Sequence, residues 1–169
     1  MEAPVASLPA EEAAAAVLQE YWDLGSEQTP LPVDPIHIAR SQGIQVFTAA
    51  LEEGVSGLLI RRAGDEPRIY LNESESRTRQ RFTTAHELGH FAQRAGSHAV
   101  LAFVDRRDQL AGRGTDPDEV YANRFAAALL MPSEAARRLR DYLDVSTMAK
   151  QFGVSPEAMT NRLKNLRVT

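Results

Sequence analysis

The sequence predicts an α+β fold, in which a small β-sheet packs with a larger helical part. Two observations support this class. Short β-rich runs separated by glycine and proline gather between residues 44 and 71, whereas the segments on either side show helical periodicity and helix caps. The 169 residues, 43% hydrophobic and 25% charged, suit one globular domain or one domain with a small appendage.

Two helices are expected before the sheet. Residues 11–24 are rich in alanine and carry an apolar face, and Gly25 ends that helix. Asp34 followed by Pro35 is a favourable N-cap and first helical residue, so a second helix begins there and ends near Gly43. Three strands follow, because β-rich runs are separated by turn residues. They are residues 44–48, 55–60 and 68–71.

The middle of the chain is predicted to hold two long helices. Residues 74–93 form the first, and Asp116 with Pro117 begins the second, which continues to Leu130. Between them, residues 100–104 (VLAFV) are either a strand or a buried loop.

The composition excludes several classes of protein. The chain has no cysteine, so a disulfide framework and a thiolate metal site are excluded, and any metal must be held by histidine and carboxylate. The N-terminus lacks the positive segment of a signal peptide, and no apolar run approaches the roughly 18 residues that span a membrane. The net charge of -4 gives no whole-chain signal for nucleic-acid binding. We therefore expect a cytoplasmic protein without a membrane partner.

His86, Glu87 and His90 form an HExxH motif within the predicted helix 74–93. Residues four apart lie on one face of a helix, so both imidazoles can bind the same zinc ion. Glu87 lies beside them, where it can take a proton from a zinc-bound water and pass it to the leaving amine. Gly89 costs about 1 kcal/mol in a helix relative to alanine, which indicates that another backbone passes close to this site.

A third ligand must come from elsewhere in the chain, because catalytic zinc takes three protein ligands and leaves one position open. The pattern HExxHxxGxxH is not present, which excludes the metzincin arrangement. A carboxylate from the helix after residue 116 is the alternative. Glu119 lies in the first turn of that helix, whose alanines allow close approach, and Asp118 is the runner-up. The other candidates are His98, Asp105, Asp108 and Asp116.

Two stretches resemble the paired signature of the ImmA/IrrE-type zinc metallopeptidase family. They are RTRQRFTTAHELGH, residues 77–90, and EVYANRFAAALLMP, residues 119–132. The resemblance implies a zincin-like fold with Zn²⁺ as cofactor. It also implies that His86, His90 and Glu119 are the metal ligands and that Glu87 is the catalytic acid and base.

Members of this family typically act as proteases on helix-turn-helix transcriptional repressors, often in stress-response loci or mobile elements. The resemblance therefore implies an enzyme of transcription regulation and stress response. Its expected activity is that of a zinc-dependent endopeptidase, and its expected partner is a protein substrate of the repressor type.

The chain is expected to divide into a zincin-like metallopeptidase domain, residues 1–133, and a C-terminal helical segment, residues 134–169. Ser133 is a favourable N-cap for the first helix of that segment. Its last two helices, about residues 146–152 and 155–166, resemble a helix-turn-helix unit.

The last helix presents residue types that contact phosphates and base edges in DNA-binding proteins. They are Asn161, Arg162, Lys164, Asn165 and Arg167. The alternative function is therefore a DNA-binding or partner-binding regulator that uses residues 145–169, with zinc as a structural or sensory element. From residue 134 onward the chain has seven Lys/Arg and four Asp/Glu, which is a small excess of positive charge for a DNA-binding segment. Docking of a partner or packing on the catalytic domain is the preferred interpretation.

Three arginines, Arg77, Arg79 and Arg81, alternate with polar residues at the start of the helix that carries the HExxH motif. They can recognise an acidic substrate segment, or they can be solvated helix charges. We expect the second, because arginine side chains are mostly exposed.

Overall fold

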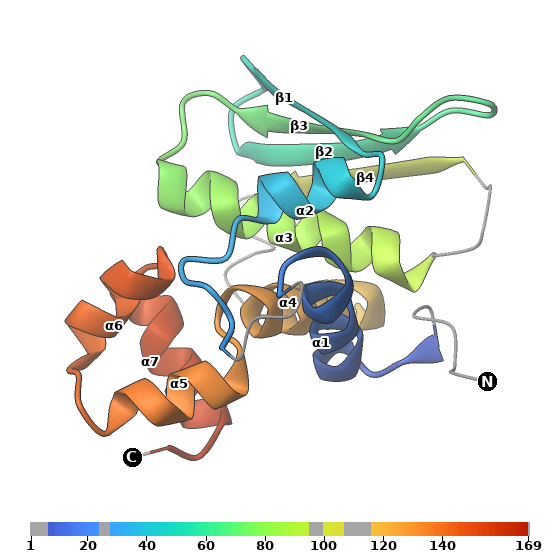
Figure 1. Ribbon diagram of the computed structural model, residues 1–169. Helices are drawn as coiled ribbons and strands as arrows, with labels where there is room; N and C mark the ends of the chain where they lie inside the picture. Colours follow the sequence, from blue (N-terminus) through green and yellow to red (C-terminus); the bar gives the residue numbers. More distant parts are fainter. Residues whose placement is uncertain (1–6, 24–27, 95–99, 107–115, 169) are drawn as a thin grey trace.

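The computed structural model describes residues 7–23, 28–94, 100–106 and 116–168 (Figure 1). Within these ranges the chain forms seven helices and one sheet of four strands. The predicted α+β class is confirmed. None of the helices in the described part of the chain combines the length and the apolar character that crossing a membrane requires.

The elements follow the predicted order. They are α1 (Ala10–Tyr21), α2 (Pro35–Ser41), β1 (Gln45–Ala49), β2 (Val55–Arg61), β3 (Arg68–Asn72), α3 (Arg77–Gln93), β4 (Leu101–Arg106), α4 (Pro117–Leu130), α5 (Ser133–Arg140), α6 (Val145–Phe152) and α7 (Pro156–Asn165). Most bounds lie within a few residues of those predicted. The segment 100–104, which the sequence leaves open between strand and loop, belongs to strand β4.

The sheet is mixed, with strand order β1-β3-β2-β4. Strand β1 pairs with β3 in parallel, and the other two pairings are antiparallel. Figure 1 shows the helices gathered on one side of the sheet, with α3 directly beneath it. Strands β1 and β4 therefore form the two edges of the sheet within the described residues.

Helix α3 occupies the centre of the fold. Its N-cap is Ser76, whose Oγ accepts a hydrogen bond from the backbone N–H of Arg79 at 3.3 Å. It contacts β2, β3 and β4 on the sheet side, α4 and α1 on the other, and α2 as well. Because both sides are covered, its second half is buried almost throughout, from Thr83 to His90.

Gly89 allows α4 to approach α3 closely. A Cβ atom at this position would lie 2.8 Å from the Cα of Ala122 and 3.1 Å from the Cβ of Phe125, closer than carbon atoms pack. The backbone that the sequence predicts beside Gly89 is therefore that of α4. This contact is the reason that the first turn of α4 reaches the HExxH residues.

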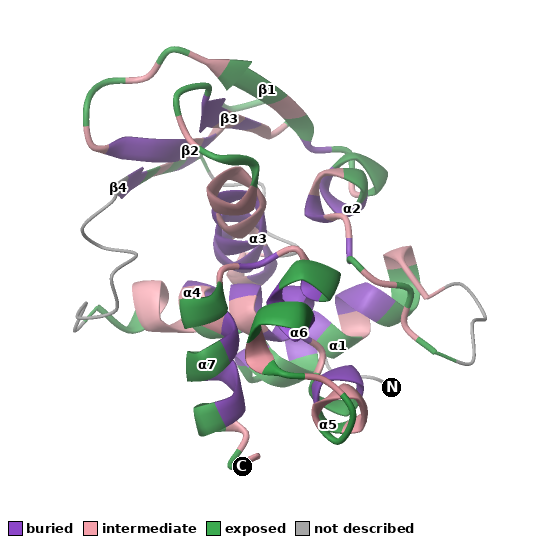
Figure 2. Cartoon of the chain, turned by 90° about the vertical axis from the view of Figure 1, so that its left-hand side faces the viewer, coloured by how far each residue is buried: buried purple, intermediate pink, exposed green. Residues whose placement is uncertain are grey.

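The C-terminal helices lie below α3 and beside α4 (Figure 2). Helices α6 and α7 meet at Gly153, which adopts the left-handed conformation with φ of +66°. Ser155 caps α7 by accepting a hydrogen bond from the N–H of Ala158 at 3.1 Å. The helix-turn-helix shape is therefore present, and its buried residues include Met148, Phe152 and Met159.

Two details of the sequence-based description are wrong. Ser133 is the first residue of α5 and not its N-cap; Pro132 stands at the cap position and no side chain bonds the free N–H groups there. Arg81 is not a solvated charge. Its guanidinium donates to the carbonyl oxygens of Val33, Phe152 and Gly153 at 2.6, 3.3 and 3.0 Å, so it joins α3 to the turn between α6 and α7.

Candidate metal centre

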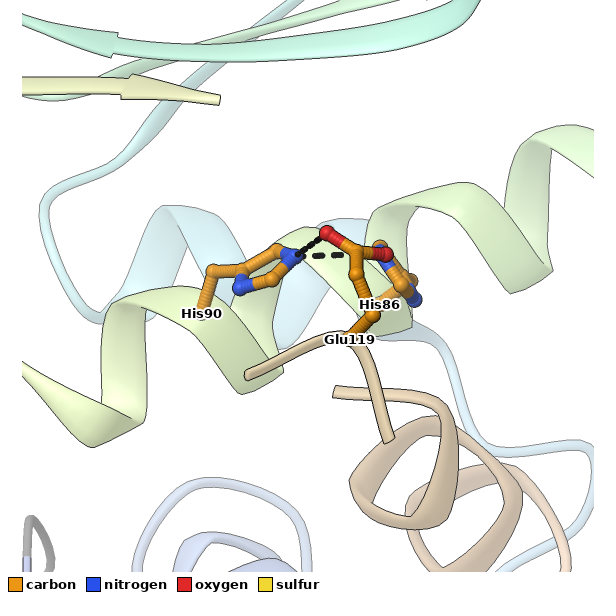
Figure 3. A group of neighbouring side chains, drawn as sticks. All are labelled: His86, His90 and Glu119. Carbon is orange, nitrogen blue, oxygen red and sulfur yellow. Dashed lines mark hydrogen bonds and ion pairs between the residues drawn. The ribbon is translucent and has the colours of Figure 1, made fainter. Parts of the chain in front are cut away.

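Helix α3 presents His86, Glu87 and His90 toward the inside of the molecule. Their exposed fractions are 0%, 0% and 1%, which is unusual for groups that can carry charge. The two histidines lie one turn apart, with ring centroids separated by 4.7 Å. The first turn of α4 adds the carboxylate of Glu119 (Figure 3). The structure thus brings together the three residues proposed as ligands.

The distances within this group suit a tetrahedral zinc site. The Nε2 atoms of His86 and His90 are 3.1 Å apart, and Glu119 oxygens lie 3.3 and 3.2 Å from them. Zinc bonds of about 2.0–2.1 Å place two tetrahedral ligand atoms roughly 3.3–3.4 Å apart. The donor atoms of the three side chains are therefore spaced closely enough to share one ion.

The protonation states also fit a metal. Burial, followed by the charge of His86, lowers the pKa of His90 to about 4, so this imidazole is neutral near pH 7. The adjacent imidazole of His86 is the main cause that lowers the pKa of Glu119, against the opposing effect of partial burial. A neutral imidazole and an ionised carboxylate are the forms that bind zinc.

Asn123 sets the orientation of His86. Its Oδ1 atom lies 3.1 Å from Nδ1 of His86, and a carbonyl oxygen can only accept, so Nδ1–H donates. In the neutral ring Nε2 then carries the lone pair and points at Glu119 and His90. Asn123 is not among the site residues predicted from the sequence. The available signal was its position one turn after Glu119, on the same face of α4.

The ring of His90 rests on strand β4. It stacks on Phe103 with a centroid distance of 4.4 Å and an angle of 8° between the rings. The guanidinium of Arg94 lies over the same Phe103, 4.5 Å from its centroid. His90 is therefore held by the sheet, whereas His86 is held by α4.

Glu87 lies in a closed environment beneath the sheet. Neither of its carboxylate oxygens has a hydrogen-bond partner among the described residues. Burial, followed by the charges of Asp105 and Glu119, raises the pKa of Glu87 well above its ordinary range. Gly57 on β2 makes room for the neighbouring Thr83, because a Cβ at this position would lie 2.4 Å from Cγ2 of Thr83, whereas it would lie at an ordinary contact distance of 3.7 Å from Oε1 of Glu87.

Asp105 is a third buried carboxylate of this region. It is 3% exposed, and burial raises its pKa to about 7. The sheet register pairs Asp105 with Gly57, so both face α3. Two buried carboxyl groups with raised pKa values, Glu87 and Asp105, therefore lie beside the histidine pair. A divalent cation at this position would favour their ionised forms.

The other candidate ligands lie apart from the histidine pair or outside the described residues. Asp118 bonds to Arg94 at 2.8 Å and to Gln93 at 3.4 Å, on the outer side of α3. Asp116 is the N-cap of α4 and accepts from the N–H of Asp118. His98 and Asp108 lie outside the described residues.

A buried histidine pair one turn apart on a central helix, with a glutamate between them and another from a second helix, defines a metallopeptidase-like protein of the zincin type. A known family covers most of the chain. The family described as the IrrE N-terminal-like domain, a peptidase family, matches residues 39–164. The chain belongs to this family, so the resemblance to the ImmA/IrrE type is confirmed.

Among solved structures, the chain is similar to a Mycobacterium tuberculosis transcriptional regulator. The two share 19% sequence identity and superpose with a TM-score of 0.63 over 92% of this chain and 46% of that one. The chain therefore spans about half the length of that protein, and the likeness shows a shared fold. No curated protein matches the chain.

Proposed function

We propose that this protein is a zinc-dependent endopeptidase in which His86, His90 and Glu119 hold the metal and Glu87 is the general base. The observation that carries the proposal is the carboxylate of Glu87, which is fully buried next to the three donors with no hydrogen bond to either oxygen. A buried ionisable group without a partner is costly, and a purely structural metal site gives no reason to keep one.

Zinc bound by these side chains would polarise the scissile carbonyl and acidify a water molecule. Glu87 takes the proton from the attacking water and delivers it to the nitrogen of the leaving amine. Asn123 keeps Nε2 of His86 directed at the metal position throughout. The closed surroundings of Glu87 strengthen its interaction with the proton it holds, because little water competes.

Strand β4 supplies a surface for an extended substrate. Within the described residues it has β2 as its one strand partner, so its other edge presents free backbone groups. Phe103 of this strand stacks on His90, which supports a substrate position near the proposed metal site. A peptide added to this edge would be held by main-chain hydrogen bonds, as in other complexes that extend a sheet.

We further propose that the substrate is a DNA-binding repressor with a helix-turn-helix fold. The support is the family to which the chain belongs and the description of its structural neighbour as a transcriptional regulator. Gene regulation by proteolysis would use the same metal centre. The division of the chain at residue 133 also stays a proposal, and the family match runs across it.

Elemental analysis of the purified protein is the first test. We expect about one zinc ion per chain, lost in the variant His86→Ala. The second test is cleavage of a proteome-derived peptide library, followed by mass spectrometry, with Glu87→Gln as the matched variant. We expect Glu87→Gln to keep its zinc and to lose cleavage. A protein without zinc, or cleavage that survives in Glu87→Gln, would refute the mechanism.

A further inference from the structure

A groove of about 770 Å³ lies between α3, α4 and α7. Asn123 and Ala127 line its α4 side four residues apart, on one face of the helix, and Met131 lines it just after the helix ends. At the helical rise, the eight steps from Asn123 to Met131 correspond to about 12 Å. The groove therefore follows α4 for this length.

One end of the groove lies at the metal centre. Asn123 lines the groove, and the same side chain accepts the hydrogen bond from His86. Phe82 lines the groove from α3 and precedes His86 by one helical turn. A chain that leaves the metal centre in this direction enters the groove directly.

Helix α7 forms the wall opposite α3. Its Asn161 and Asn165 are exposed residues one turn apart, and both line the groove. No hydrogen bond within the described residues uses either amide group. Figure 2 shows exposed residues along one side of α7 and buried ones along the other.

The orientation of α7 is fixed by its buried side chains, of which Arg162 also lines the groove. Arg162 is 3% exposed and donates from Nε to the carbonyl oxygen of Met131 at 2.9 Å. Its two terminal nitrogens form a bidentate ion pair with Glu11 of α1. Met159 and Leu163 are buried beside it. Helix α7 therefore cannot turn its two asparagines elsewhere without breaking these contacts.

This arrangement limits the use of α7 as a DNA-reading helix. Of the five polar residues expected to reach DNA, Asn161 and Asn165 face the groove and Arg162 is buried. Lys164 and Arg167 remain exposed on the helix and just after it. Two cations are few compared with the six to ten phosphate contacts of typical DNA-binding proteins.

The spacing of the two asparagines suits an extended peptide. Positions four apart on a helix are separated by about 6 Å along its axis. In an extended chain, peptide groups that point to the same side recur every two residues, at about 6.6 Å. A carboxamide offers a donor and an acceptor, and so does each peptide group. A groove of about 12 Å accepts about four extended residues.

We propose that α7 is one wall of the substrate cleft. An extended segment of about four substrate residues, next to the scissile bond, lies between α3 and α7. The amides of Asn161 and Asn165 bond its backbone, and an apolar side chain of the segment packs on Phe82 and Ala127. This inference rests on the proposed endopeptidase function and gives the helix-turn-helix unit a part in substrate binding.

The test uses a phage-displayed library of random peptides, selected against the purified full chain that carries Glu87→Gln. Selected peptides are synthesised with a fluorophore, and their dissociation constants are measured by anisotropy. In the double variant Asn161→Ala, Asn165→Ala we expect binding about tenfold weaker or more, because two hydrogen bonds are lost. The matched control is Lys164→Ala, an exposed change on the same helix outside the groove, for which we expect a change below about twofold.

Several outcomes would overturn the inference. These are a library that yields no binding peptide, equal affinity for the double variant, and an equal loss in Lys164→Ala. Salt-sensitive binding of duplex DNA that the double variant loses would instead assign α7 to DNA. Thermal unfolding of each variant shows whether a loss of binding reflects a loss of folding.

The proposed function is tested separately with the wild-type chain. Selected peptides that bind through the groove but are not cut by the wild-type zinc protein would refute the endopeptidase function. The proposed role of α7 in peptide binding would remain supported. If the wild-type protein cuts them and the double variant cuts them with an unchanged KM, the cleft wall fails while the function stands.

Discussion

The helix pairs α3–α4 and α6–α7 bury very different groups. Helix α3 buries two histidines beside α4 and the carboxylate of Glu87 beneath the sheet, and several of their polar atoms have no partner among the described residues. Between α6 and α7 lie mainly apolar side chains. The buried cation of α7, Arg162, bonds with its three nitrogens to Met131 and Glu11.

This difference distinguishes residues kept for catalysis from residues that hold the fold together. A buried polar group that is fully bonded stabilises an arrangement of elements, whereas a buried polar group without partners costs stability and is kept for another reason. Changes in α3 should therefore affect metal binding and catalysis more than folding. Changes in the buried side of α7 should affect folding and leave the metal centre in place. Four predictions test this contrast.

The largest expected effect is that of Glu87→Gln on cleavage. Removing a general base reduces the rate by about 10²–10⁴-fold, and the amide keeps the shape of the site. Because the amide avoids burying a carboxylate, we expect the chelator-treated variant to unfold at the same temperature as the wild type or higher. Peptide cleavage and thermal unfolding measure the two effects. A large loss of stability would show that Glu87 is structural.

The second prediction concerns Arg162→Ala. The change leaves the carbonyl of Met131 without its donor and Glu11 without its partner, so we expect a loss of about 2–4 kcal/mol in the free energy of unfolding. Zinc content should stay near one ion per chain. Urea denaturation measures the loss, with Lys164→Ala as the control. Equal stability of the two variants would contradict the structural role of Arg162.

The third prediction concerns Asp105 in the metal-free protein. Its folded-state pKa of about 7 lies above the ordinary value of 3.8, so the folded chain binds a proton that the unfolded chain releases. The stability that comes from this bound proton is fully present below pH 3.8 and is lost as the pH rises through 7. We compare the free energy of unfolding of Asp105→Asn with that of the wild type. Between pH 5 and pH 7 this difference should change by about 2 kcal/mol in favour of the variant.

Urea denaturation in the presence of a chelator, at pH 5, 6 and 7, measures this trend. Asp65→Asn, a change in an exposed turn, is the matched control and should leave the pH dependence of stability unaltered. A constant difference between Asp105→Asn and the wild type over this range would show that Asp105 is ionised in the fold.

The smallest expected effect is that of Asn123→Ala on zinc affinity. Partners that orient a metal-bound histidine contribute about 10–100-fold to metal affinity, and a single neutral hydrogen bond belongs at the lower end. Competition with a zinc chelator measures the change. Asn123→Asp keeps an acceptor for Nδ1 of His86 and should restore most of the affinity. Failure of this rescue would indicate that Asn123 acts through packing alone.

Much of the fold and of the site follows from local sequence. Ser76, Asp34 and Ser155 cap their helices because a side-chain oxygen next to a free N–H group needs no tertiary contact. The HExxH spacing places its histidines on one face for the same local reason. Gly89 indicated the close approach of a second backbone. Glycine destabilises a helix interior, so its presence there is explained where a side chain would not fit.

The remaining features required the tertiary structure. Glu119 and Asp118 are adjacent in sequence and equally placed by helix propensity, and the packing of α4 on α3 turns one toward the histidines and the other toward Arg94. Asp105, Arg81 and Arg162 gain their roles from elements far away in the sequence. Local sequence determines which backbone each segment adopts, because those interactions span a few residues. Which side chains meet is decided by how buried faces fit together, and that is a property of the whole fold.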